Sequence, residues 1–142
     1  MSKKKFLSLV LVFLLLFNVL SPTAMAAVTS VSKFPVTIQY THISMAYSYL
    51  EIYNSGTAHI SGFVQCTSSG KYIMLTCTLQ RLENGTWNHV YSWTTTSTSS
   101  YASIDKTYTV SKGTYRVRTE YHVFAGDDHE WGTVDSVTVI YK

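Results

Sequence analysis

The sequence has few charged residues, and it contains only two cysteines and two prolines. Charged residues make up 13% of the 142-residue chain, and no block of lysine or arginine follows Lys5. Three of the 11 basic residues lie at positions 3–5, so the chain after residue 26 holds eight basic and eight acidic residues. Nucleic-acid-binding proteins usually carry a cluster of basic residues, whereas the charges here are balanced and scattered. We therefore predict no nucleic-acid partner.

Recognisable catalytic and cofactor motifs are also missing. There is no G-x-S-x-G elbow, no H-E-x-x-H and no phosphate-binding glycine loop. His42, His59 and His122 do not have the spacing of a zinc site. The run from Asp127 to Glu130 offers oxygen ligands for calcium but lacks the alternating spacing and central glycine of the known calcium loop, which favours a solvated turn. We predict no enzyme, no cofactor and no metal site.

The first 26 residues have the order of a secretory signal peptide. Three lysines are followed by the apolar run Phe6–Leu20 and then by Ala24-Met25-Ala26, a small-residue cleavage signal. The apolar run is shorter than the roughly 20 residues that a membrane-spanning helix needs. No cysteine stands at the cleavage point, and no second long apolar run follows Tyr40. We predict a secreted protein that is cleaved after Ala26 and has no membrane span in its mature chain.

The rest of the chain is rich in strand-forming residues. All 11 tyrosines and all three tryptophans follow residue 26, while alanine, leucine and glutamate are sparse. Turn signals recur about every ten residues, as in sandwiches and barrels. Residues 27–42 are predicted as a leader and first edge, and 43–142 as one domain. Its seven predicted strands are about Ser44–Tyr53, Thr57–Thr67, Tyr72–Leu82, Trp87–Thr95, Ala102–Val110, Thr114–Phe124 and Trp131–Tyr141.

Two connections between these strands carry specific expectations. Asn84-Gly85 predicts a tight hairpin turn, because both residues tolerate positive φ. The triplet Asn84-Gly85-Thr86 also fits a glycosylation acceptor, although the turn is the favoured interpretation. The run Ala125–His129 is predicted as a loop.

Seven strands in about 100 residues suggest a single antiparallel immunoglobulin-like β-sandwich. In Gly113–Val117, Tyr115 stands where such folds place a tyrosine corner, near the start of the sixth strand. Val117 occupies the place of the second cysteine of antibody domains, so an antibody-type domain is excluded.

The stretch Gly56–Val123 resembles a family of small, uncharacterised secreted proteins of Gram-positive bacteria. The similar pieces are Ser61-Gly62-Phe63-Val64, Leu75-Thr76-Cys77-Thr78-Leu79-Gln80-Arg81, Gly85-Thr86-Trp87 with Trp93, and Gly113-Thr114-Tyr115-Arg116-Val117. The resemblance implies an exported immunoglobulin-like domain of unknown function, and it brings no activity.

Cys66 and Cys77 are the only cysteines, and both fall on the inward faces of strands predicted to be adjacent. In an oxidising compartment, opposed strand cysteines can form a disulfide. Two small buried apolar residues are the alternative, and the sequence leaves the choice open.

The candidate contact surface lies on two predicted strands. Trp87, His89, Tyr91 and Trp93 occupy alternate positions and share one face if their strand is regular, which would make a stacking platform. In the alternative, a bulge breaks the register and Trp93, with or without Trp87, packs in the core. Arg116, Arg118, Glu120 and His122 line another outward face, suited to an anionic partner or to ordinary cross-strand pairs.

The predicted function is a secreted, non-enzymatic binding or interaction module. Its ligand is unknown, with a carbohydrate or a cell-surface or cell-wall component as the expected class. The ligand-binding residues are predicted to be Trp87, His89, Tyr91, Trp93, Arg116, Arg118 and His122. The alternatives are a secreted bacteriocin-like toxin and an extracellular hydrolase whose site the sequence does not reveal.

Overall fold

The computed structural model describes residues 41–142. The predicted signal peptide and nearly all of the leader lie outside this range. The described chain is all β, with eight strands: β1 (Ile43–Ile52), β2 (Thr57–Cys66), β3 (Tyr72–Glu83), β4 (Thr86–Ser97), β5 (Tyr101–Thr109), β6 (Gly113–Ala125), β7 (Asp128–Asp135) and β8 (Val139–Tyr141).

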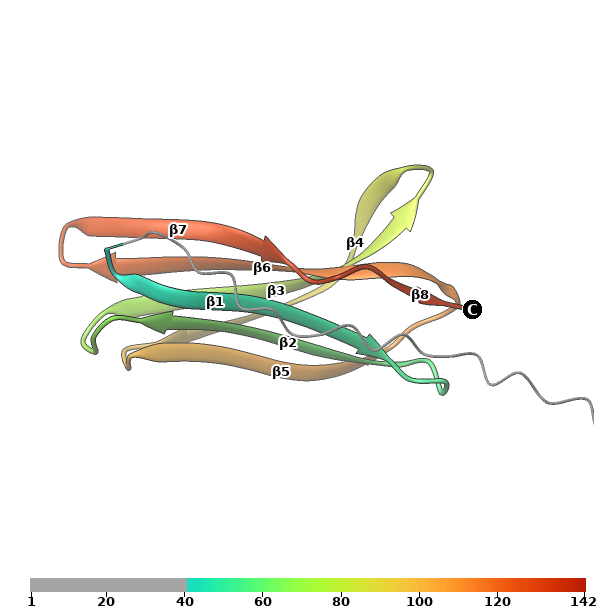
Figure 1. The fold of residues 1–142 in the computed structure, drawn as a ribbon, viewed down its shortest axis with the longest axis horizontal. Helices are drawn as coiled ribbons and strands as arrows, with labels where there is room; N and C mark the ends of the chain where they lie inside the picture. The colour runs from blue at the N-terminus through green and yellow to red at the C-terminus, as the bar shows by residue number, and fades with distance from the viewer. Residues whose placement is uncertain (1–40) are drawn as a thin grey trace, which may run out of the picture.

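The strands form two antiparallel sheets that lie in two layers (Figure 1). One sheet has the order β1-β2-β5, and the other has the order β4-β3-β6-β7, with β8 also paired to β6. Alternate residues of each strand point into the space between the layers, as the buried positions Ile73, Leu75, Cys77 and Leu79 of β3 show. The prediction of an all-β chain of antiparallel strands is therefore confirmed, and the arrangement is sandwich-like.

The predicted seventh strand is two strands, because the chain leaves the ladder around Ser136. The Ser136 N–H donates to the Val117 carbonyl at 2.8 Å, and the Ser136 hydroxyl accepts from the Val117 N–H at 2.9 Å. That hydroxyl also donates to the Val137 carbonyl at 2.8 Å. Strand β7 therefore ends at Asp135, and β8 begins at Val139.

The loop predicted at Ala125–His129 is a two-residue hairpin turn. Ala125 pairs with Asp128, so only Gly126 and Asp127 connect β6 to β7. Gly126 has φ 64°, which tight hairpin turns require and which glycine adopts without steric cost. The predicted turn at Asn84-Gly85 is confirmed, with φ 51° and 79° at the two residues.

The tyrosine corner predicted at Tyr115 is also present. Tyr115 is buried near the start of β6, and its hydroxyl donates to the Ser111 carbonyl at 2.9 Å. This bond ties β6 to the connection that precedes it, and it satisfies the polar end of a large core side chain.

Of the two alternatives for Cys66 and Cys77, the disulfide is wrong, because both thiols are free and buried. Cys77 faces Gly62 across the two sheets, and Gly62 lies four residues from Cys66 along β2. Four strand residues span about 13 Å, whereas a disulfide needs Cα atoms closer than about 7 Å. The prediction treated β2 and β3 as neighbours, but they belong to different sheets.

A polar chain links the two sheets beside Cys77. The Thr119 hydroxyl of β6 donates to the Ser48 hydroxyl of β1 at 2.9 Å, and Ser48 donates to the Val117 carbonyl at 3.0 Å. The Cys77 sulfur lies 3.4 Å from the Thr119 hydroxyl. These bonds satisfy the polar atoms that the sandwich buries here.

Candidate functional site

Strand β4 changes face at a β-bulge. Tyr91 pairs with Leu79 and His89 pairs with Gln80, so Val90 is an extra residue without a partner on β3. His89 and Trp87 therefore share the outer face of the five-stranded sheet, whereas Tyr91 lies on the inner side. The prediction of one face for all four side chains is wrong, and the alternative of a bulge is confirmed.

Tyr91 and Trp93 close one side of the sandwich. Trp93 is partly buried against the core, and its ring centroid lies 6.0 Å from that of Tyr108 on β5. The Tyr91 ring stacks on Tyr108 at 5.5 Å with an interplanar angle of 29°. This cluster joins edge strand β4 of one sheet to edge strand β5 of the other, which is a packing role.

Arg116 and Arg118 lie on the outer face, where both bind Asp135 of β7. Arg118 donates two hydrogen bonds to the Asp135 carboxylate, at 2.8 and 2.9 Å, and Arg116 donates one at 2.8 Å. Hydrogen bonds from Arg118 hold the pKa of Asp135 below its usual value of 3.8, and bonds to Asp135 raise the pKa of Arg118. Because both guanidinium groups are already hydrogen-bonded to a carboxylate, the cross-strand-pair interpretation of this stripe fits better than recognition of an anion.

The Arg116 guanidinium also lies over the Trp87 indole, 4.4 Å from the ring centroid. Its Nε donates to the Gln80 side chain at 2.8 Å. Trp87 is therefore covered on one side by a cation–π contact. The predicted contact residues at this end of the face stabilise one another.

The other end of the same face carries what we call the aromatic strip, which consists of Tyr72, His122, Phe124, His129 and Trp131. The rings of Phe124 and His129 stack at 4.4 Å with an interplanar angle of 1°. The His122 ring lies 5.2 Å from His129 and 6.1 Å from Trp131, at angles of 12° and 15°. Tyr72 of β3 extends the strip from Phe124, with centroids 5.9 Å apart.

The aromatic strip is open to solvent. The residue exposure of Trp131 is 57%, and Tyr72 and Phe124 are also exposed. Polar side chains border the aromatic strip along the sheet, because the next cross-strand pair on this face of β6 and β7 is Glu120 with Thr133. Thr76 of β3 pairs with Glu120 on the other side of β6, and its hydroxyl is hydrogen-bonded to that of Thr94 at 2.9 Å. Flat rings bordered by hydroxyl and carboxylate groups can hold a ligand that has both apolar faces and polar edges.

Of the seven predicted contact residues, the structure brings five to this outer face: Trp87, His89, Arg116, Arg118 and His122. Sequence reasoning missed Tyr72, Phe124, His129 and Trp131. His122 and Phe124 alternate on one side of the sixth predicted strand, and His129 and Trp131 alternate after Gly126-Asp127. Recognising a tight turn at that dipeptide would have placed the two pairs side by side.

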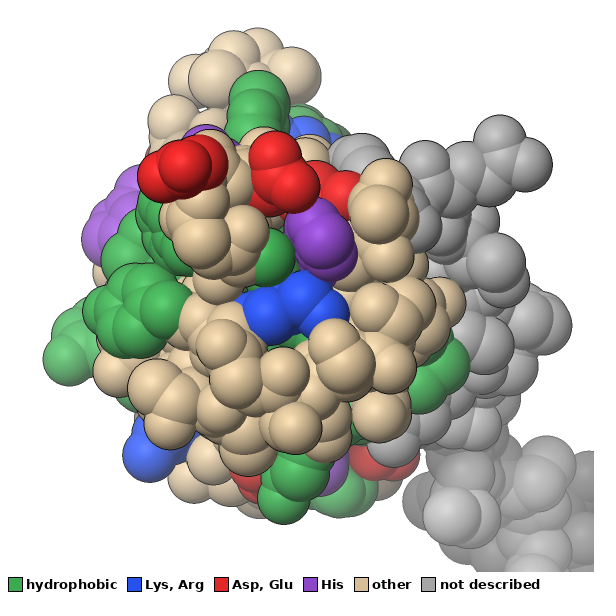
Figure 2. Space-filling view, turned by 90° about the vertical axis from the view of Figure 1, so that its left-hand side faces the viewer, with side chains coloured by type: hydrophobic (Ala, Val, Ile, Leu, Met, Phe, Trp, Pro, Cys, Tyr) green, Lys and Arg blue, Asp and Glu red, His purple; other side chains and the backbone are tan. Residues whose placement is uncertain are grey.

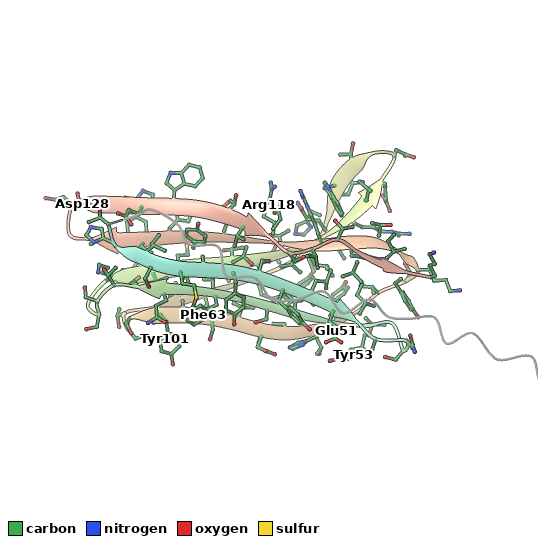
Figure 3. All side chains as sticks on the ribbon, viewed as in Figure 1. Glu51, Tyr53, Phe63, Tyr101, Arg118 and Asp128 are labelled. Atoms are coloured by element: carbon green, nitrogen blue, oxygen red, sulfur yellow. The ribbon has the colours of Figure 1, made fainter. Side chains whose placement is uncertain are left out.

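The three-stranded sheet carries a second aromatic group on its own outer face. Phe63 of β2 stacks between Tyr47 and Tyr101, with centroid distances of 5.2 and 5.9 Å. Figure 3 shows Phe63 and Tyr101 on the side of the molecule opposite Arg118. Nearby, Tyr49 donates to Glu51 at 2.8 Å, and burial together with this bond raises the pKa of Tyr49 to about 12.

The acidic residues of the β6–β7 hairpin lie at one end of the molecule. Figure 2 shows acidic side chains gathered there beside a histidine and a basic side chain. The Glu130 carboxylate accepts from the Thr41 N–H at 2.8 Å and the His42 N–H at 2.9 Å, and His42 lies 3.4 Å from Asp128. Glu130 thus holds the start of β1 against β7. Within residues 41–142, no three histidine, cysteine, aspartate or glutamate side chains are grouped so as to hold a metal ion.

Comparisons of the chain with protein-family models, curated proteins and solved structures found no match. In the part of the chain that the structure describes, no helix has the length and apolar character needed to cross a membrane.

Proposed function

We propose that this chain is an exported, non-enzymatic binding module of the immunoglobulin-like type, and that the aromatic strip binds carbohydrate at a cell surface or cell wall. Strand order supports the fold type. The order β1-β2-β5 corresponds to strands A, B and E of an immunoglobulin-like sandwich, and β3-β6-β7 corresponds to C, F and G. The hydrogen bond from Tyr115 to Ser111 is that of a tyrosine corner at the start of strand F.

The observation that carries the proposed ligand class is the exposure of near-parallel rings beside hydroxyl groups. A sugar ring has an apolar face that can lie against an indole or phenyl ring, and hydroxyl groups at its rim that need hydrogen-bond partners. The strip offers Trp131 and Phe124 for the first role and the Glu120–Thr133 rung for the second. Aromatic contacts contribute about 0.5–1.5 kcal/mol each beyond buried area, so one module binds weakly and a repetitive polymer is the suitable ligand.

The test is retention on purified peptidoglycan and on a panel of insoluble polysaccharides. We expect Trp131→Ala to weaken retention by about fivefold or more, which corresponds to about 1 kcal/mol, and Phe124→Ala to act in the same direction. Tyr101→Ala is the matched control, because it removes a ring that is 50% exposed from the opposite sheet. It should leave retention unchanged.

Two results would contradict the proposal. If Tyr101→Ala weakens retention and Trp131→Ala does not, the binding face is the other sheet. If the folded protein is retained on none of the polymers, carbohydrate binding is wrong, and killing of indicator cells or release of soluble sugar would then support the toxin or the hydrolase alternative.

A further inference from the structure

Two histidines of the aromatic strip approach each other through their ring nitrogens. His122 lies on β6 and His129 on β7, in a diagonal relation across the hairpin, since His122 pairs with Trp131 and Phe124 pairs with His129. Nδ1 of His122 is 3.0 Å from Nε2 of His129. In the metal-free protein this contact is a hydrogen bond in which one ring donates and the other accepts.

Glu120 decides which nitrogen of His122 carries the proton. Its carboxylate lies 2.9 Å from Nε2 of His122, and an ionised carboxylate only accepts hydrogen bonds. The proton of a neutral His122 ring is therefore on Nε2, and the lone pair of Nδ1 points toward His129. A carboxylate behind the far nitrogen is the usual outer partner of a metal-binding histidine, because it orients the ring and makes it more basic.

The separation of the two nitrogens suits a shared metal ion. Nitrogen ligands lie about 2.0–2.1 Å from zinc and similar ions, so two neighbouring ligands at angles of 90–110° are about 2.9–3.4 Å apart. The observed 3.0 Å is within that interval. From this geometry we infer that His122 and His129 form a binding site for a divalent transition-metal ion. The ion replaces the hydrogen bond between the rings: Nε2 of His129 gives up its proton to solvent, Nδ1 of the same ring takes up a proton, and both rings ligate as neutral imidazoles. Water or a bound ligand completes the coordination.

The surroundings determine which ion binds best. The Asp128 carboxylate contacts the His42 ring, and the Glu130 carboxylate accepts hydrogen bonds from the backbone N–H groups of Thr41 and His42. Both carboxylates are therefore engaged away from the two histidine nitrogens. Two imidazoles without a carboxylate ligand disfavour calcium and magnesium, which prefer oxygen. Copper(II) is the tightest-binding divalent ion at nitrogen sites and accepts the square-planar angle that 3.0 Å implies. We therefore expect copper(II) to bind more tightly than nickel or zinc.

The fluorescence of Trp131 provides a local measurement. Its ring lies 6.1 Å from that of His122, so a paramagnetic copper ion at the site should quench it. Titration of the mature protein with copper sulfate, without any carbohydrate, should quench part of the emission with one ion bound per chain. His122→Gln and His129→Gln should each weaken this binding tenfold or more. Trp131→Phe should remove the quenched component while calorimetry still records the bound copper.

Matched controls are His59→Gln on the opposite sheet and His89→Gln at the far end of the same face, and both should bind copper as the unaltered protein does. Far-UV circular dichroism checks that each variant is folded. The inference is overturned if His122→Gln and His129→Gln retain the affinity of the unaltered protein, or if no saturable binding occurs below about millimolar copper. Because no carbohydrate is present in this titration, neither result bears on the proposed carbohydrate binding, which the retention assay tests separately.

Discussion

Gly62 of β2 lies opposite Cys77 of β3, in the other sheet. A Cβ at this position would clash with the Cys77 sulfur and lie 2.9 Å from the Thr119 hydroxyl, and both of those residues are buried. We expect Gly62→Ala to lower the free energy of unfolding by about 1–3 kcal/mol, the usual cost of overpacking a core. Urea denaturation measures the change.

The double variant Gly62→Ala/Cys77→Ala is the control for this prediction, because it removes the sulfur that the new methyl group meets. It should be more stable than the additive effect of the two single variants. Simple additivity would show that the cost comes from the Thr119 contact or the β2 backbone and not from the contact with Cys77.

The two cysteines give a prediction that distinguishes free thiols from a disulfide. Unfolded protein that has not been reduced should react with two equivalents of a thiol reagent. The folded protein should react slowly at pH 8, because both side chains are buried and burial raises the pKa of Cys77 to about 11, which keeps the thiolate fraction small. Fewer than two reactive thiols in the unfolded state would contradict the separation of Cys66 from Cys77 in the structure.

At the scale of strands, Asp135 of β7 adds side-chain hydrogen bonds to Arg116 and Arg118 of β6. Its pKa is lowered in the folded protein, so its contribution to stability is complete above pH 3.8 and is lost as the pH falls below that value. We expect Asp135→Asn to lower the free energy of unfolding by about 1 kcal/mol at pH 7. The difference from the unaltered protein should shrink on acidification, as chemical denaturation over a pH series would show.

Asp105→Asn is the control for the Asp135 prediction. The Asp105 side chain is 72% exposed. Within residues 41–142, the one ion pair in which it takes part is that with His59. It should change stability by less than about 0.5 kcal/mol. Equal effects of the two substitutions would mean that the pair of arginines adds nothing to the hairpin.

Strand positions and faces were predictable where the local pattern is unambiguous. The alternation in β3 and the turn at Asn84-Gly85 follow from period two and from residues that tolerate positive φ. Val90 was not predictable as the bulged residue, because a bulge depends on the pairing of β4 with β3 and leaves no mark in β4 alone. The same holds for Ser136, whose hydrogen bonds to Val117 interrupt the last strand.

The candidate site was only partly predictable for a related reason. Arg116, Arg118 and His122 lie on one face of a single strand, so alternation was enough to group them. The aromatic strip joins residues of three strands, and its composition depends on sheet order and on a two-residue turn. The sequence alone supplies neither the order nor the register.

At the scale of the whole molecule, the testable expectation is export. If residues 1–26 are a signal peptide, protein recovered from the culture medium should have the mass of residues 27–142 and begin at Ala27. Intact-mass spectrometry decides this, and full-length chain in the membrane fraction would contradict it. A variant with Ala26→Leu is the control, because a large residue at the cleavage point should block processing.

The bulge in β4 also bears on whether the edge of the five-stranded sheet can pair with a second copy of the chain. β4 is a 12-residue edge strand without lysine or proline, the residues that most often protect a sheet edge from pairing with another chain. The tip of the β3–β4 hairpin turns away from the rest of the sheet (Figure 1), and Val90 lies in the strand that bends. The extra residue interrupts what would otherwise be a long, straight row of unpaired backbone groups. Removing it would present a template on which a second copy could stack edge to edge, the first step toward a fibre.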